Sequence, residues 1–458
     1  MKDYTLVVIG AGPGGYVAAH RAARLGAKVA VVENRQAGGT CLNRGCVPTK
    51  ALLHASGLYR EALDGAQWGV EASGLRFDPA AAFARKEAVV SKLRGGVETM
   101  LKSAKVDLLS GTGTILAPGK VKVQLEGEER VLTCDHILAA TGSVPARPPI
   151  PGLELPGVMT SDELLAGTAH LPSSIVIIGG GVIGVEFATF YNDLGVCVTV
   201  LEGLDRLLPN LDRELGQSLG MLLKKRGCAV QTGAMVERVE QTAQGLCVFY
   251  TQKGKPGQAV GEMVLCAIGR KPYTENLLAP GLELAQERGR LLVDASFQTS
   301  VPGIYAIGDV SSRVQLAHVA SAQGVYCVEK LYGAEPTVDL SVVPGCVYTR
   351  PEIASVGLSE QEAKAAGIAV KTGKGLTSAN ARSVIAGADR GFLKLVARAD
   401  TGAIIGAHLM CDRATDMISE LSQAIADART AQDLLHIIRP HPTFEEALHD
   451  ALTALAGK

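Results

Sequence analysis

The sequence predicts an α/β protein with parallel sheets in its N-terminal and central parts and an α+β domain at its C-terminal end. Apolar runs rich in β-branched residues alternate with helical patterns, which is typical of parallel sheets. One strand–helix–strand unit occurs twice. After Ser341 the pattern changes to short strands mixed with amphipathic helices. At roughly 150 residues per domain, the 458 residues would form about three domains.

The repeated unit defines the first two domains. Its first copy runs from the strand YTLVVIG through a glycine-rich turn and the helix AAHRAARLG to the strand AKVAVVE. Its second copy is SIVIIGGGVIGVEFATFYNDLGVCVTVLE. Between the copies, the segment PARPPIP (Pro145–Pro151) reads as a linker.

The remaining elements follow in order. A meander of short strands is expected from about Cys228 to Ile268, and GIYAIGDV reads as a further short buried strand. In the C-terminal domain, SEQEAKAAG begins with a capping box, since Ser359 is followed by Glu362. The segment ATDMISELSQAIADA predicts a second helix there.

Composition excludes several classes of function. Lys and Arg number 45 against 46 Asp and Glu, so the net charge of −1 gives no electrostatic footprint for nucleic acid or an acidic membrane. Aromatic residues are only 4%, which disfavours a surface on which single-stranded nucleic acid or sugars would stack against aromatic side chains. No membrane span or secretory signal is recognised, and the ten cysteines do not suggest a disulfide scaffold. We therefore expect a cytoplasmic protein with no nucleic-acid or membrane partner.

Both copies of the repeat carry a GxGxxG fingerprint directly after a strand. The first glycine makes the tight turn, the second lets the backbone approach a pyrophosphate, and the third lets helix and strand pack closely. Each fingerprint is followed 18 residues later by an acid that closes the next strand and can bind ribose hydroxyls. The residues are Gly10, Gly12, Gly15 and Glu33 in the first copy, and Gly179, Gly181, Gly184 and Glu202 in the second.

Two such units predict two Rossmann-like domains, each with a bound dinucleotide, and electron transfer between the two cofactors. A carboxylate at Glu202 would repel a 2′-phosphate. The second unit should therefore prefer NAD to NADP.

Cys41 and Cys46 lie in the segment GGTCLNRGCVPTK. In a regular helix, residues five apart are separated by a rise of about 7.5 Å, too far for a relaxed disulfide. Gly45 and Pro48 make an irregular backbone plausible, and a strained bridge at a helix start would be easily reduced. From spacing alone, a redox pair and two unrelated thiols both remain open. No second cysteine or histidine pair completes a metal site, so none is expected.

Over essentially its whole length, the sequence resembles the pyridine nucleotide-disulfide oxidoreductase family. The resemblance is carried by GAGPGGYVAA, GGTCLNRGCVPTK, AATG at 139–142, GGGVIGVE, AIGRKP at 267–272, AIGDV at 306–310 and HPTFEE at 441–446. It implies FAD on the first unit, with Glu33 on its ribose and Asp309 on its ribityl and phosphate region. NAD would bind the second unit. Further cofactor contacts are expected from Lys50, Thr141, Gly142 and Gly269.

The resemblance also implies a set of catalytic residues. Cys41 would exchange with the substrate disulfide, and Cys46 would face the flavin. Lys50, paired with Glu186, would lie near the reactive edge of the isoalloxazine. His441 and Glu446 would form an acid–base pair supplied by the partner subunit, which implies a homodimer.

The resemblance further implies domains and partners. Residues 1–150, completed by about 271–340, would bind FAD, residues 151–270 would bind NAD, and residues 341–458 would form the dimer interface. Such a flavoprotein would oxidise protein-bound dihydrolipoyl groups and reduce NAD+. Its partner would be a lipoyl-bearing acyltransferase of a 2-oxoacid dehydrogenase complex, or a glycine-cleavage carrier protein.

Two other functions are also considered. One is an NAD(P)H-dependent reductase of another small disulfide, and the other is a non-catalytic docking scaffold. The retained cysteines argue against the scaffold. Arg439 and Pro440 depart from the pattern, because many members that act on lipoyl groups carry a histidine at the position of Arg439.

Overall fold

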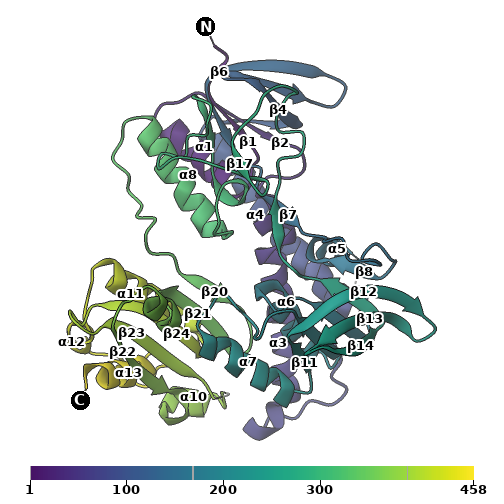
Figure 1. Ribbon diagram of the computed structural model, residues 1–458, viewed down its shortest axis with the longest axis vertical. Helices are drawn as coiled ribbons and strands as arrows, with labels where there is room; N and C mark the ends of the chain where they lie inside the picture. The colour runs from purple at the N-terminus through teal and green to yellow at the C-terminus, as the bar shows by residue number, and fades with distance from the viewer. Residues whose placement is uncertain (1, 168–169, 389, 458) are drawn as a thin grey trace.

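The computed structural model describes residues 2–167, 170–388 and 390–457, and they form three bodies that are each built on a main sheet (Figure 1). The first two bodies carry parallel strands, whereas the third is antiparallel. The predicted class, α/β with a C-terminal α+β domain, is confirmed. Within the described part of the chain, no helix is both long enough and apolar enough to span a bilayer.

The first sheet has seven strands and joins distant parts of the chain. Its strands are β1 (Tyr4–Ile9), β2 (Val29–Glu33), β3 (Asp107–Ser110), β4 (Thr112–Ala117), β5 (Lys120–Gln124), β6 (Glu129–Ala139) and β19 (Ile304–Ala306). β1 pairs in parallel with β2 and β6, and β19 pairs in parallel with the end of β6. Beside the sheet, α1 (Pro13–Arg24) packs against α8 (Ala317–Leu331), so the segment around β19 returns to the first body (Figure 1).

Helices α2 (Gly39–Arg44) and α3 (Cys46–Leu63) follow β2 and are separated by Gly45. α3 packs against α4 (Pro79–Ser103) and also against α6 (Val182–Asp193) of the second body. A short 3-10 turn, η1 (Gly65–Trp68), follows α3. α3 thus carries the segment after the cysteine pair from the first body to the second.

The second body has a five-stranded parallel sheet in the order β11-β10-β9-β15-β8. These strands are β8 (Val158–Thr160), β9 (Ser174–Ile178), β10 (Cys197–Glu202), β11 (Ala229–Thr232) and β15 (Met263–Cys266). The predicted meander is present as an antiparallel sheet of β12 (Ala234–Thr242), β13 (Gly245–Gln252) and β14 (Lys255–Gly261). Its helices are α5 (Ser161–Ala166), α6 and α7 (Arg213–Lys225).

Two connections link the first and second bodies. β7 (Ser143–Pro145) and β16 (Arg270–Pro272) pair in antiparallel fashion where the chain leaves and re-enters the first body. Two small elements follow β16 in the chain. They are the hairpin of β17 (Gln286–Glu287) and β18 (Arg290–Leu291) and the 3-10 turn η2 (Gly308–Val310).

The third body is an antiparallel sheet in the order β20-β21-β24-β23-β22. The strands are β20 (Gly345–Val347), β21 (Glu352–Gly357), β22 (Val370–Leu376), β23 (Phe392–Arg398) and β24 (Ile404–Cys411). Its helical elements are α9 (Glu360–Ala365), η3 (Thr377–Ala379), α10 (Ala381–Ile385), α11 (Ala414–Ala426), α12 (Ala431–Leu435) and α13 (Glu446–Ala456). The predicted capping box is present at α9, and ATDMISELSQAIADA forms α11.

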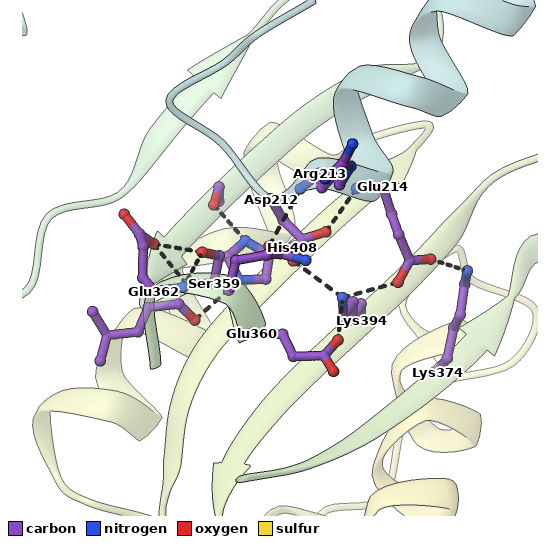
Figure 2. Close-up of polar contacts among 12 residues, drawn as sticks. Asp212, Arg213, Glu214, Ser359, Glu360, Glu362, Lys374, Lys394 and His408 are labelled. Carbon is purple, nitrogen blue, oxygen red and sulfur yellow. Dashed lines mark hydrogen bonds and ion pairs between the residues drawn. The ribbon is translucent and has the colours of Figure 1, made fainter. Parts of the chain in front are cut away.

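A buried ionic cluster centred on Lys394 joins the third body to the second (Figure 2). The Lys394 ammonium on β23 lies 3.1 Å from Asp212 and 2.9 Å from both Glu214 and Glu360, and its side chain is only 3% exposed. Asp212 also caps α7 by accepting the Glu214 N–H. Burial alone would lower the pKa of Lys394, but the three carboxylates outweigh it and raise that pKa.

Candidate active site

A cavity of about 1600 Å³ lies between the bodies and is lined by parts of all three. Both GxGxxG turns, the cysteine pair and the segment around β20 reach it. The sequence-predicted residues that line it are Gly10, Gly12, Glu33, Cys41, Cys46, Lys50, Thr141, Gly142, Gly179, Gly181, Glu186, Glu202, Gly269 and Asp309. Gly15, Gly184, His441 and Glu446 are not among its lining residues.

The first and third glycines of each fingerprint serve backbone packing. Gly10 has φ 103°, and a Cβ there would lie 2.4 Å from the Ala140 carbonyl oxygen. A Cβ on Gly15 would lie 1.9 Å from the Gly10 carbonyl oxygen. Gly179 and Gly184 show the same two close approaches. Side chains are therefore excluded at these positions.

The middle glycines instead leave open space for a ligand. Gly12 and Gly181 are the N-caps of α1 and α6, and neither helix start has a side-chain cap. A Cβ at Gly181 would meet nothing within 4 Å. The unpaired N–H groups of both helix starts therefore suit a pyrophosphate, as predicted for dinucleotides.

The two predicted ribose-binding acids are held in the same way. Glu33 accepts backbone N–H groups from Ala11 at 2.8 Å and Arg35 at 2.9 Å. Glu202 accepts them from Gly180 at 2.6 Å and Leu204 at 2.7 Å. Each carboxylate is thus fixed at its strand end with remaining lone pairs available to hydroxyl donors.

The backbone between Cys41 and Cys46 is irregular, as the glycine and proline predicted. Cys41 lies in α2, Gly45 interrupts the helix at φ −143° and ψ −114°, and Cys46 is the first residue of α3. The break lets the two side chains meet, although a continuous helix would hold them apart. Both are free thiols, and each shifts the pKa of the other.

The two thiols have opposite acidities. The hydrogen bond from Cys41 and the positive charge of Lys50 lower the pKa of Cys46 to about 7, against the effect of burial. The same hydrogen bond, together with burial, raises the pKa of Cys41. Cys46 also begins a helix, where a thiolate is favoured. The reduced pair therefore holds its negative charge on Cys46 and its proton on Cys41.

Lys50 is held beside the pair by Glu186. Its ammonium lies 2.8 and 2.7 Å from the two Glu186 carboxylate oxygens, and Glu186 is 3% exposed. Glu186 also accepts the Tyr348 N–H at 3.0 Å, and Lys50 lies 4.7 Å from the centre of the Tyr348 ring. A fixed cation therefore lines the cavity next to Cys46.

Asp309 is linked to the cysteine segment through a polar chain. Its carboxylate accepts the Ser143 hydroxyl at 2.6 Å, and Ser143 accepts Arg270 Nε at 2.8 Å. Arg270 and Arg44 lie 3.4 and 3.7 Å from opposite oxygens of Asp162. Burial raises the pKa of Asp309. Arg44 lies between the two cysteines in sequence, so these polar contacts connect Asp309 to the cysteine segment.

Comparison with known proteins decides the family. The model of the pyridine nucleotide-disulphide oxidoreductases matches residues 4–324, and the model of their dimerisation domain matches residues 343–452. The chain belongs to this family.

Relatives cover the chain from end to end. It is 43% identical to a dihydrolipoyl dehydrogenase of Bacillus subtilis (strain 168), with 100% of this chain and 98% of that one covered. It is 40% identical to dihydrolipoyl dehydrogenase 3 of Pseudomonas putida, with 100% and 99% covered. Among solved structures, LpdA from Mycobacterium tuberculosis has a TM-score of 0.89 at 28% identity, covering 98% of this chain and 99% of that one. The Cu(II) complex of the HOCl-induced flavoprotein disulfide reductase RclA from Escherichia coli has a TM-score of 0.88 at 29% identity, with 99% of each chain covered.

The family's dimerisation domain supports a homodimer and bears on the predicted acid–base pair. His441 Nδ1 lies 2.8 Å from a Glu446 carboxylate oxygen, and the His441 side chain is 71% exposed. The Thr443 N–H and His441 lower the pKa of Glu446. The pair is formed, but the structure does not bring it to the cysteines of its own chain.

Some residues of the site in this oxidoreductase were missed from the sequence. Ser143 directly follows Gly142, and Arg270 directly follows Gly269. Because both glycines were predicted to contact a cofactor, these two polar neighbours, which hydrogen-bond to each other, could have been included in the predicted site. Tyr348 is 162 residues away from Glu186, and nothing local marks it. Thr141 was predicted as a cofactor contact, and its hydroxyl donates to the Tyr273 carbonyl at 2.5 Å.

Proposed function

We propose that this chain is a dihydrolipoyl dehydrogenase, a flavoprotein that oxidises protein-bound dihydrolipoyl groups and reduces NAD+. The observation that carries the proposal is the Cys41–Cys46 thiol pair, which lines one cavity together with two dinucleotide cradles. Two relatives of 43 and 40% identity are dihydrolipoyl dehydrogenases and align with this chain over nearly their full length, which supports the same activity.

FAD and NAD are the cofactors. The cradle of Gly10, Gly12 and Glu33 suits FAD, and Asp309 and Lys50 line the same cavity. The cradle of the second fingerprint and Glu202 suits NAD. When bound, FAD supplies two-electron transfer from the thiol pair to NAD+.

The chain's own residues carry out the thiol chemistry. With the pair oxidised, one dihydrolipoyl thiolate attacks the Cys41 sulfur, the disulfide breaks, and its electron pair leaves on Cys46. The second dihydrolipoyl thiolate then displaces Cys41, which takes up a proton, and the lipoyl disulfide is released. Cys46 suits a leaving thiolate because its pKa is about 7.

His441 of the partner subunit acts as the base in this exchange. Only a thiolate attacks, so each dihydrolipoyl thiol must lose a proton near neutral pH. A histidine held by Glu446 can take that proton and return it. The pair lies outside the cavity of its own chain, and this favours delivery across a dimer.

The remaining assignments also belong to this proposal. Residues 1–150 with about 271–340 bind FAD, residues 151–270 bind NAD, and residues 341–458 form the dimer interface. The partner is a lipoyl-bearing acyltransferase of a 2-oxoacid dehydrogenase complex or a glycine-cleavage carrier protein, and the enzyme acts in the cytoplasm.

Turnover of the purified yellow protein with dihydrolipoamide tests this function, with NAD+ and NADP+ compared. Rapid NADH formation with little NADPH is expected. Absence of lipoamide turnover in protein that holds FAD and still reduces ferricyanide with NADH would contradict the proposal. Glutathione disulfide with each reduced nucleotide is the assay for the alternative, a reductase of another small disulfide.

A variant of His441 tests the proposed base. His441→Gln should slow dihydrolipoamide oxidation and leave NADH–ferricyanide activity unchanged, because the latter needs no thiol deprotonation. His449→Gln, an exposed residue of α13, is the matched control. Equal slowing of both reactions would exclude the acid–base role.

A further inference from the structure

Arg439 is buried at the junction of three helices, although its neighbours in sequence are exposed. Its side chain is 4% exposed, whereas Ile438 is 95% exposed. Its Nη1 donates to the carbonyls of Leu434 at 3.2 Å and Ile437 at 3.5 Å, at the end of α12. A cation suits a helix C-terminus, where carbonyls lack partners.

Two carboxylates from other helices complete the surroundings of Arg439. Its Nη2 lies 2.5 Å from Glu420 of α11, and its Nε lies 3.8 Å from Glu445, the N-cap residue of α13. The nearby Glu445 carboxylate also acts to raise the pKa of Glu420. Burial raises the pKa of Glu420 even though Arg439 opposes this. The guanidinium therefore holds together two acids that would otherwise repel each other.

The segment between Arg439 and Glu446 is a closed loop that carries His441. The Thr443 hydroxyl donates to the Pro440 carbonyl at 2.9 Å, and the Thr443 N–H donates to Glu446 at 2.8 Å. From outside the loop, Asn380 donates to the Thr443 carbonyl at 2.9 Å. Arg439 binds at one end of the loop and faces Glu445 at the other, next to the His441 partner Glu446.

We propose that Arg439 is a positioning residue for the His441–Glu446 pair. By joining α12, Glu420 and Glu445, it fixes both ends of the loop and so fixes the direction in which His441 projects. This inference rests on the proposed function, in which His441 handles the thiol proton. The guanidinium side chain is 4% exposed and its hydrogen bonds are spent within its own domain, so Arg439 acts through His441 and does not contact substrate itself.

The test compares three variants of the full-length holoenzyme. Arg439→Met should lower kcat with dihydrolipoamide by about 10- to 100-fold, because small displacements of a catalytic group have effects of that size. The KM for NAD+ and the NADH–ferricyanide rate should stay unchanged. Arg439→Lys should recover part of the loss, because an ammonium can pair with Glu420 but lacks the planar set of donors. Arg413→Met is the matched control, since Arg413 makes an exposed pair with Asp416.

A milder variant covers the case in which Arg439→Met does not fold. Glu445→Gln keeps the side-chain shape and removes the charge that Arg439 faces, so it should lower the same kcat by a smaller factor. The inference is overturned if these variants match Arg413→Met within about twofold. It is also overturned if lipoamide and ferricyanide rates fall together. Wild-type protein that cannot oxidise dihydrolipoamide would instead contradict the proposed function.

Discussion

The interaction between Cys41 of α2 and Cys46, the first residue of α3, lowers the pKa of Cys46 and raises that of Cys41. The two residues belong to different helices, and the break at Gly45 turns the second helix so that its first residue faces the first helix. The proton of the reduced pair is thereby assigned to Cys41 and the charge to Cys46. This arrangement gives the two chemically identical side chains different acidities.

The acidity of Cys46 should depend on both of its neighbours. Its folded pKa is about 7, so the reactive thiolate is present above this pH and is lost as the pH falls below it. The interaction with Cys41 is the largest cause of the lowered Cys46 pKa. Cys41→Ala should therefore raise the pKa of Cys46 toward the ordinary value of about 8.5, and Lys50→Met should raise it less. Alkylation of Cys46 by iodoacetamide across pH, followed by mass spectrometry, measures this. Exposed Lys371→Met is the control, and an unchanged profile in Cys41→Ala would contradict the assignment.

Loss of either thiol should abolish lipoyl oxidation. Cys41→Ser and Cys46→Ser should each lower dihydrolipoamide turnover by about a thousandfold or more, since each thiol is needed for the exchange. NADH–ferricyanide activity should persist, because it bypasses the pair. Cys197→Ser, at an exposed thiol outside the cavity, is expected to keep both activities. Full lipoamide turnover in Cys41→Ser would refute the mechanism.

Glu202 should set the preference for NAD. Glu202→Ala removes a charged hydrogen-bond acceptor, so the KM for NAD+ should rise about 10- to 100-fold. The KM for NADP+ should rise much less, because a repulsive charge is also removed. Asp205→Ala, in an exposed ion pair nearby, is the control for charge alone. Parallel rises for both nucleotides in steady-state kinetics would mean that Glu202 acts only on the glycine turn.

The Lys394 cluster should dominate the link between the second and third bodies. Lys394→Met leaves Asp212, Glu214 and Glu360 without their shared cation and should lower the free energy of unfolding by about 3–5 kcal/mol. Lys364→Met, which removes a more exposed partner of Glu360, should cost less than about 1 kcal/mol. Chemical denaturation at neutral pH gives the free energy of unfolding of both variants. Equal decreases in the two variants would contradict the central role of Lys394.

The same cluster should shape stability in acid. The pKa of Glu360 is lowered to about 2 by Lys364 and Lys394, below an unfolded value of about 4.3. Its contribution is therefore present above about pH 4.3 and is lost as the pH falls toward about 2. Glu360→Gln should flatten this part of the stability–pH curve, measured by denaturation at each pH. A curve parallel to that of the wild type would exclude the effect.

Much of the fold could be predicted because its signals are local. The repeated units, the glycine turns and the capping box at Ser359 depend on residues within a few positions of each other. Gly45 likewise predicted the irregular backbone that is found between the cysteines. In each case, the chemistry of the peptide chain itself selects the conformation.

The rest depends on contacts between distant segments. Lys394 lies among apolar residues in FLKLVAR, and its burial becomes tolerable only because acids from 212–214 and 360 converge on it. In the sequence, Arg439 is only a departure from the family pattern, and nothing local indicates that its side chain lies inside its own domain. Both charges are stabilised by partners that no sequence window contains.

The separation of the exposed His441–Glu446 pair from the cysteines has a genetic consequence. A chain with Cys41→Ser keeps an intact base, and a chain with His441→Gln keeps intact thiols. If the partner subunit supplies the base, as proposed, both sites of each homodimer are defective, whereas a mixed dimer holds one complete site and one doubly defective site. Co-expressing the two alleles should therefore restore lipoyl oxidation that neither supports alone, with half the sites of each heterodimer working.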